Sequence, residues 1–229
     1  MKLPSLVAGR FEQRVNRFRV TVTVDGHSVD AHLPNSGRLR ELLTPGRPCW
    51  LDPRSSAGRK TNYDLKLVEY GDVLVSVDAR LPNPLLAEAL EQGQLAPFRA
   101  YHRFEREASL GKSRIDFRLM KPRGILWVET KSVTLVEEGV ALFPDAPTAR
   151  GTRHVEELTR VVSEGARAAI VFIVQRPDAR RFTPHDGADP LFGRALRRAA
   201  AAGVAVHAWG CEVSEQAIAV AEQITVDLL

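Results

Sequence analysis

Two short apolar segments joined by a turn carry the side chains of this chain that are best suited to chemistry. The segments, Arg114–Met120 and Ile125–Lys131, flank a Pro/Gly turn, which is typical of paired antiparallel strands. A turn centred on residues 122–123 places Asp116 opposite Glu129. Directly opposed residues have Cβ atoms roughly 4.5–5.5 Å apart, where like charges repel each other. The sequence therefore predicts two carboxylates close together on one face of a hairpin.

The same face of the hairpin is expected to carry an amine. Side chains alternate along a strand, so Lys131 points to the same side as Glu129. A divalent cation between the two carboxylates would relieve their repulsion, and oxygen ligands of this kind suit Mg²⁺. The pattern predicts a lysine beside a metal-bound water, which is what metal-assisted phosphodiester hydrolysis requires.

The first 80 residues, which precede this hairpin, are expected to form a small barrel. Residues 6–79 contain short strand-like segments separated by turn signals such as Asp25-Gly26. The expected strands are 18–24, 27–33, 49–51, 63–68 and 73–77, with a helical turn at 38–43. Strands of this length and spacing favour a five-stranded OB-like barrel. A change of character near residue 80 divides the chain into domains 1–80 and 81–229.

The second domain is expected to be a mixed sheet with helices on its faces. Its first helix has Asn83 as N-cap and Pro84 at the first helical position. The further elements expected are strands 103–109, 114–120 and 125–135, helix 153–163, strand 169–174, helix 190–202, strand 204–209 and helix 212–223. The order α-β-β-β-α-β-α-β-α places this domain in the α/β class.

The order of elements and the acidic hairpin together resemble the PD-(D/E)xK nuclease superfamily. The resemblance implies that Asp116 and Glu129 bind a metal ion together with the Thr130 carbonyl. It implies that Lys131 is the catalytic lysine, and it gives Gln175, at the end of the buried strand, a place in the catalytic site. From the residues alone, the alternatives are a solvent-facing, salt-bridged hairpin and a polar strand terminus.

A polar loop at residues 143–154 leads into the next helix. Two prolines stiffen this loop, and Thr152 is expected to be the helix N-cap. Arg150, Arg153 and His154 gather at the helix N-terminus, where free amide groups already favour anions. The pattern predicts phosphate binding, and a capped structural loop is the alternative.

The charge balance of the chain permits nucleic-acid binding without requiring it. The formal net charge is +4, and 6 of the 32 basic residues are lysines. Arginine binds phosphate bidentately, although a GC-rich genome would give the same bias. Besides the loop residues above, the candidate nucleic-acid-binding residues are Arg17, Arg38, Arg59, Lys60, Arg114 and Arg176.

Aromatic residues accompany the basic residues of the barrel. Phe11, Phe18 and Trp50 are interleaved with arginines. OB-like barrels that bind single strands combine aromatic platforms with a basic groove. The alternative is that these aromatics belong to the core, and we expect this for Phe18 and Trp50.

The apolar and cysteine content indicates a cytoplasmic protein with no membrane partner. The longest strongly apolar run, 168–174, is far too short to span a bilayer. No apolar signal region is expected at the N-terminus. Cys49 and Cys211 are far apart and lack partners at metal-site spacing, as expected of isolated thiols in a reducing compartment.

Several longer stretches are similar to a single family. They are residues 16–18, 32–38, 113–117, 128–135 and 143–154. Over nearly the whole chain they resemble the sugar fermentation stimulation (SfsA) family. The resemblance implies an OB-like domain followed by a nuclease-like domain, DNA binding, and a link to sugar (maltose-type) utilisation genes.

These observations favour a DNA-binding protein with a Mg²⁺- or Mn²⁺-dependent nuclease site. The alternative is a non-catalytic DNA-binding regulator that uses a nuclease-like scaffold, and a third hypothesis is an RNA-processing enzyme with the same site. Nuclease-like domains often pair as homodimers, although this sequence shows no long apolar seam that would require a second copy.

Overall fold

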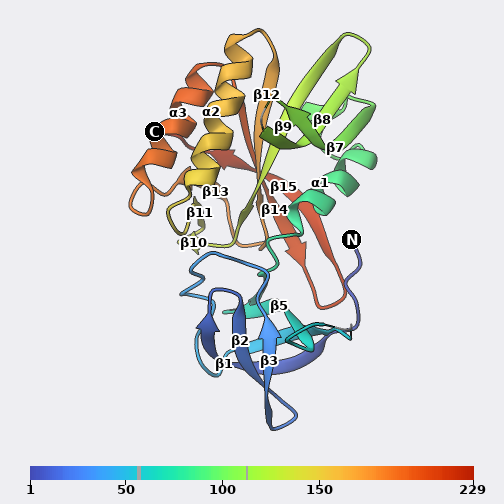
Figure 1. Ribbon diagram of the computed structural model, residues 1–229, viewed down its shortest axis with the longest axis vertical. Coiled ribbons are helices and arrows are strands. Elements are labelled where there is room, and N and C mark those ends of the chain that lie inside the picture. Colours follow the sequence, from blue (N-terminus) through green and yellow to red (C-terminus); the bar gives the residue numbers. More distant parts are fainter. Residues whose placement is uncertain (56–57, 112) are drawn as a thin grey trace.

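The protein contains two sheets, one on each side of residue 80 (Figure 1). The computed structural model describes residues 1–55, 58–111 and 113–229. Six strands lie in the N-terminal sheet and nine in the C-terminal sheet. Within these described ranges, no helix is both long and apolar enough to cross a membrane.

The N-terminal sheet is a closed barrel. Its strands are β1 (Val7–Asn16), β2 (Arg19–Val24), β3 (His27–His32), β4 (Pro48–Pro53), β5 (Tyr63–Tyr70) and β6 (Val73–Ser76). They follow the order β3-β2-β1-β4-β5-β6, and a parallel pairing of β3 with β5 closes the first five into a barrel. This confirms the predicted OB fold. Strand β1 was not predicted as a strand.

Alternation of side chains explains how β2 builds the barrel core. Val20, Val22 and Val24 are buried, whereas Thr21 and Thr23 between them are only half-buried. Because successive side chains of a strand point to opposite faces, these three valines reach the interior together. They pack against Phe11 and other buried residues of the barrel.

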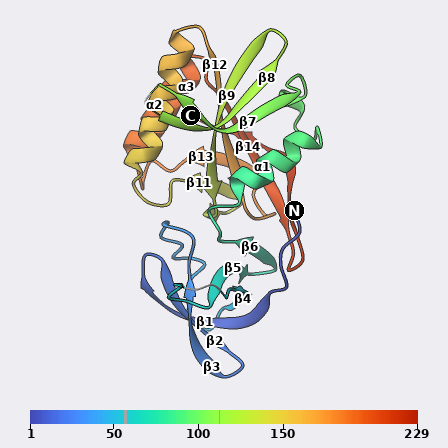
Figure 2. The same ribbon diagram turned by 45° about the vertical axis from the view of Figure 1, so that its right-hand side comes forward.

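The C-terminal sheet is mixed and carries helices on both faces (Figure 2). Its strands are β7 (Arg103–Leu110), β8 (Ser113–Lys121), β9 (Gly124–Val133), β10 (Val136–Glu137), β11 (Val140–Phe143), β12 (Arg167–Val174), β13 (Arg181–Pro184), β14 (Ala205–Val213) and β15 (Ile218–Val226). The strand order is β10-β11-β13-β15-β14-β12-β9-β8-β7. Strands β7, β8 and β9 pair antiparallel, and β12 pairs in parallel with β9 and β14.

The central strand β12 separates two apolar cores. Ile170, Phe172 and Val174 pack with α2 (Ala149–Ser163) and α3 (Pro190–Ala201), and the intervening residues pack with α1 (Pro82–Glu91). A strand covered on both faces is apolar nearly throughout, as β12 is from residue 168 to its end. A short 3-10 helix, Ala96–Phe98, follows α1.

The helix predicted at residues 212–223 is wrong. Strand β14 continues to Val213, and β15 begins at Ile218 and pairs with it antiparallel. Ile218 and Val220 are buried, with a half-buried alanine between them. The alanines and glutamates of this segment favour a helix locally, but pairing with the neighbouring strand overrides that preference.

The starts of two helices also differ from prediction. Helix α2 begins at Ala149, and its N-cap is Thr148, whose hydroxyl accepts a hydrogen bond from the Gly151 amide. Helix α1 begins at Pro82, so Asn83 lies inside its first turn. The Asn83 side chain is therefore not a cap and is available for another contact. Strands β10, β11 and β13 were not predicted.

Candidate functional site

Six of the predicted site residues line one cavity. This cavity, of about 250 Å³, lies where the start of α1, strands β8 and β9, and the start of α2 meet. The six residues are Asp116, Glu129, Thr130, Lys131, Arg150 and His154. The predicted hairpin register is confirmed, because Met120 pairs with Ile125.

Glu129 is the buried acid of the cavity, with 3% of its surface exposed. Its Oε1 accepts hydrogen bonds from Lys131 Nζ at 2.6 Å and from His154 Nδ1. Burial favours the neutral acid, but the His154 hydrogen bond and the Lys131 charge outweigh it and lower the pKa of Glu129 below 4.5. Glu129 is therefore ionised at neutral pH.

The second oxygen of Glu129 has no partner within the part of the chain that the structure describes. Oε2 is buried, and no described residue donates a hydrogen bond to it. An unsatisfied buried acceptor costs about 1–3 kcal/mol, and more when it is charged. A bound cation would satisfy this oxygen, so the cavity fits a metal ion.

Asp116 is the second acid of the cavity, and both of its oxygens are engaged. Oδ1 accepts from Asn83 Nδ2 at 2.8 Å, and Oδ2 accepts from the Thr130 amide at 2.8 Å and from the Thr130 hydroxyl at 2.6 Å. The Thr130 hydroxyl also contacts Asn83 Oδ1. These contacts fix the carboxylate between α1 and β9.

The donor set available to a metal is small and rich in oxygen. In the described part of the chain, no three His, Cys, Asp or Glu side chains form a metal-binding group. Asp116 and Glu129 are the acidic side chains that line the cavity in this part of the chain. Carboxylate and carbonyl oxygens suit Mg²⁺ and Mn²⁺, and Mg²⁺ ordinarily keeps several waters.

Two residues of the site were missed in the sequence. Asn83 was predicted to be only an N-cap, yet its amide holds Asp116. Arg80 was assigned to the domain boundary, yet it lines the cavity. The only feature of the sequence that could have identified them is their position, since both flank the start of the helix that follows the barrel.

Arg80 is held by buried carboxylates of the barrel side. Its guanidinium donates to both oxygens of Asp78, at 2.8 and 2.7 Å, and to Asp64 at 2.9 Å. Asp78 is fully buried and also accepts from Lys66 Nζ at 2.7 Å. Burial opposes ionisation of Asp78, but the bonds from Arg80 and Lys66 outweigh it and lower the pKa of Asp78.

The start of α2 forms another wall of the cavity. Thr148, Arg150, Gly151 and His154 line it. Helix N-termini attract anions because their first amide groups lack partners within the helix. Arg153 is exposed but does not line the cavity.

Gln175 and Arg176 are not placed as predicted. Both are fully buried where the barrel meets the C-terminal sheet. The Gln175 amide donates to Ser132 Oγ at 2.9 Å and to the Asp78 carbonyl at 3.2 Å. Arg176 pairs with Asp178 at 2.6 Å and donates to the Thr134 carbonyl. Neither side chain lines the cavity. The catalytic role of Gln175 and the nucleic-acid contact of Arg176 stay predictions.

The other predicted basic residues lie on the surface outside this cavity. Arg17, Arg38, Arg59, Lys60 and Arg114 are all exposed. Arg59 also pairs with Asp64, which is buried. These side chains can meet a ligand that extends beyond the cavity.

Comparison with known proteins identifies the family. A family model described as the sugar fermentation stimulation protein RE domain matches residues 80–217, and one described as the SfsA N-terminal OB domain matches residues 13–77. The chain belongs to the SfsA family. The sugar fermentation stimulation protein homolog of Desulforamulus reducens is 46% identical over 226 residues, covering 99% of this chain and 94% of that one.

Two further SfsA proteins match over nearly their whole length. The homolog of Moorella thermoacetica is 45% identical over 232 residues, with full coverage of both chains. The solved structure of SfsA from Pyrococcus furiosus, in complex with Ca²⁺, is 34% identical with a TM-score of 0.91. The match covers 99% of this chain and 98% of that one. The architecture described above is therefore that of the family.

Proposed function

We propose that this SfsA protein is a divalent-metal-dependent nuclease that acts on DNA in the cytoplasm. The observation that carries the proposal is the unpaired, buried Oε2 of an ionised Glu129 in a cavity shared with Asp116 and Lys131. The SfsA protein of Pyrococcus furiosus, which has the same fold, is described in complex with Ca²⁺. The unpaired oxygen supports a cation in this cavity, and the related structure supports binding of a divalent cation.

Asp116, Glu129 and the Thr130 carbonyl would hold the ion. When bound there, Mg²⁺ or Mn²⁺ would supply a Lewis acid for the scissile phosphate and would lower the pKa of a bound water. Asn83 and the Thr130 amide keep the Asp116 carboxylate in place, so this oxygen donor is preorganised.

Lys131 would orient the attacking water. This role is supported by the position of its ammonium, which lies against Glu129 in the same cavity. His154 donates to Glu129 Oε1 and keeps that oxygen satisfied, which leaves Oε2 as the free acceptor. Arg80, Arg150 and the N-terminus of α2 offer positive charge to the phosphate.

A cleavage assay tests the proposal. Purified protein is incubated with labelled single- and double-stranded DNA and RNA in EDTA, Mg²⁺ or Mn²⁺, beside the variants Asp116→Asn and Asp186→Asn. Asp186 is an exposed carboxylate that pairs with Arg197, remote in sequence from the cavity residues.

We expect metal-dependent cleavage by the wild type and by Asp186→Asn, and none by Asp116→Asn. Cleavage by Asp116→Asn at the wild-type rate would overturn the proposal. Binding without cleavage under every metal would instead favour a non-catalytic DNA-binding regulator, and cleavage confined to RNA would favour an RNA-processing enzyme.

A further inference from the structure

A partly exposed aromatic ring lies at the turn between β1 and β2. Phe18 was expected in the barrel core, but 46% of its surface is exposed, whereas Phe11 on β1 is 2% exposed. Trp50, also expected in the core, is half-buried. Val15, near the end of β1, is exposed as well. An exposed ring gives up the stabilisation that burial provides, so its position needs another explanation.

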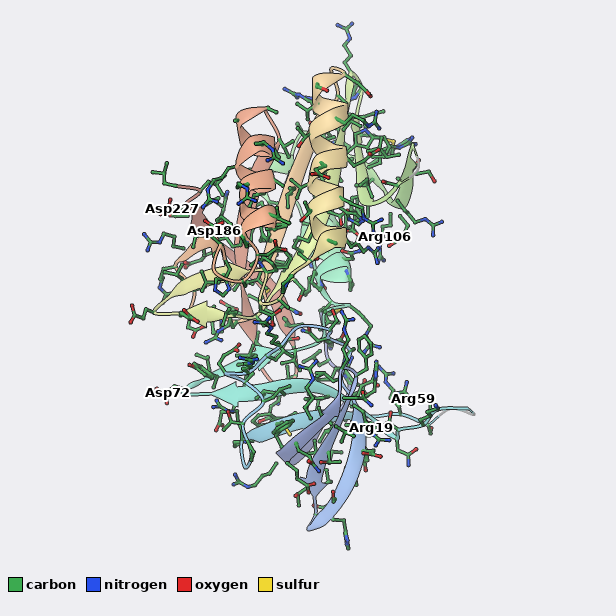
Figure 3. The ribbon with its side chains drawn as sticks, turned by 60° about the vertical axis from the view of Figure 1, so that its left-hand side comes forward. Arg19, Arg59, Asp72, Arg106, Asp186 and Asp227 are labelled. Carbon is green, nitrogen blue, oxygen red and sulfur yellow. The ribbon has the colours of Figure 1, made fainter. Side chains whose placement is uncertain are left out.

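An arginine and a histidine lie close to the Phe18 ring. The Arg17 guanidinium carbon lies 5.4 Å from the ring centroid, and the His32 ring centroid lies 6.4 Å away. Arg19, at the start of β2, is exposed and approaches Asp30 at 3.7 Å. Arg19 and Arg59 lie on one side of the barrel, and Asp72 lies on the other (Figure 3). Aromatic platforms among cations are typical of surfaces that bind single-stranded nucleic acid.

Arg14 ties this turn to the loop that follows β3. Its Nη2 donates to the Arg17 carbonyl at 2.8 Å, and its Nη1 donates to the carbonyls of Gly37 and Arg38 at 2.7 Å each. The loop of residues 34–39 is therefore fixed beside the Phe18 turn. Its Arg38 side chain is exposed.

The same loop contacts the segments that line the cavity. The Leu39 amide donates to Asp145 Oδ2 at 3.1 Å. Asp145 lies three residues before Thr148, the N-cap of α2. Gly37 approaches Asp145 so closely that an added Cβ would lie 2.6 Å from Oδ2. The Ala79 amide, on the other wall of the cavity, donates to the Pro34 carbonyl at 3.0 Å. Hydrogen bonds thus connect the Phe18 turn to the cavity through this loop.

We propose that the ligand of this surface is single-stranded nucleic acid, whose backbone leaves the cavity past Arg38 and one of whose bases stacks on Phe18. The inference rests on the proposed function only in that the strand is cleaved in the cavity. The stacking contact itself requires no cleavage. A base within a duplex already stacks on both neighbours and offers no free face, whereas an unpaired base does. Because every base has such a face, the contact tolerates any sequence.

Binding without cleavage tests the inference. A fluorescent oligothymidylate and a duplex of the same length are titrated with the full-length protein in EDTA, and anisotropy reports affinity. The variants are Phe18→Ala, Phe18→Trp and Leu191→Ala. Leu191, on α3, is 63% exposed and is the matched exposed apolar control.

We expect Phe18→Ala to weaken single-strand binding about 5- to 150-fold, the range that corresponds to loss of one stacked base. Phe18→Trp should retain the affinity, and Leu191→Ala should not change it. Because Phe18 is exposed, the alanine variant should keep the wild-type thermal unfolding curve. A Phe18-dependent affinity in EDTA would uphold the inference even if no metal supports cleavage.

Two outcomes would overturn the inference. One is a Phe18→Ala variant that binds the single strand as tightly as the wild type. The other is a loss of affinity that is equal for single strand and duplex, because the ring would then be a general contact. Metal-dependent cleavage accompanied by either outcome would leave the proposed function standing without this surface.

Discussion

Two buried carboxylates in this protein differ in how many of their oxygens accept hydrogen bonds. Asp78, beside the barrel, has both oxygens engaged by Lys66 and Arg80. Glu129, in the cavity, has one oxygen engaged by Lys131 and His154, while the other lacks a partner among the described residues. Both have a lowered pKa despite burial. The fully paired group is therefore expected to serve the fold, and the half-paired group to serve a ligand.

The two carboxylates differ in whether the chain itself supplies all of their partners. Around Asp78 positive charge is supplied by the chain itself, so the cluster is complete when the protein folds. Around Glu129 the neighbouring Lys131 and His154 donors satisfy a single oxygen, and a partner for the other oxygen must come from solution. Unsatisfied buried polar groups are rare in native proteins and often mark functional sites.

The largest effect is expected from breaking the complete cluster. Asp78→Asn removes the nearer counter-charge of the buried Lys66, at 2.7 Å, and leaves only Asp52 at 3.8 Å. Removal of one partner of a buried pair costs about 3–5 kcal/mol. Urea unfolding measures this loss of stability. Asp186→Asn, which breaks an exposed pair with Arg197, should cost less than about 1 kcal/mol. Equal small losses in the two variants would contradict a structural role for the Asp78 cluster.

A smaller effect is expected from loosening the cavity. Asn83→Ala removes the hydrogen bond to Asp116 Oδ1, and a hydrogen bond to a charged group contributes about 1.5–3 kcal/mol. We expect kcat/KM for metal-dependent cleavage to fall about tenfold or more, since 1.36 kcal/mol corresponds to a factor of ten. Gln92→Ala, an exposed amide at the other end of α1, is the control. An unchanged kcat/KM would show that Asp116 does not need this support.

The smallest effect is expected in how the free energy of unfolding depends on pH in acid. The pKa of Asp78 in the folded protein lies below its ordinary value of 3.8. Its contribution to stability is therefore complete above pH 3.8 and is lost as the pH falls through the folded pKa. The difference in unfolding free energy between wild type and Asp78→Asn should narrow as the pH falls below 3.8. A constant difference down to acid unfolding would mean that the Asp78 charge contributes nothing.

The hairpin of the site was predictable because its information is local. A Pro/Gly turn fixes the pairing of Met120 with Ile125, and alternation then assigns the charged side chains to their face. The barrel was predictable for the same reason, since its strands are short and separated by turns.

Features that depend on docking of distant segments were not predictable. Gln175 and Arg176 follow a buried strand, as expected, but the barrel covers them, and nothing near them in the sequence specifies that contact. The strand at Ile218–Val226 replaces a predicted helix because its partner strand supplies the hydrogen bonds. Phe18 is exposed because its turn projects from the barrel, although its neighbours alternate like core residues.

Calorimetric titration of Mn²⁺ into the metal-free protein tests the central claim most directly. The wild type and Asp186→Asn should bind one ion, whereas Glu129→Gln, which removes the charge beside the unpaired oxygen, should bind it at least about tenfold more weakly. Far-UV circular dichroism checks that each variant is folded. An equal affinity in the wild type and Glu129→Gln would contradict the claim that the unpaired carboxylate oxygen marks a metal site.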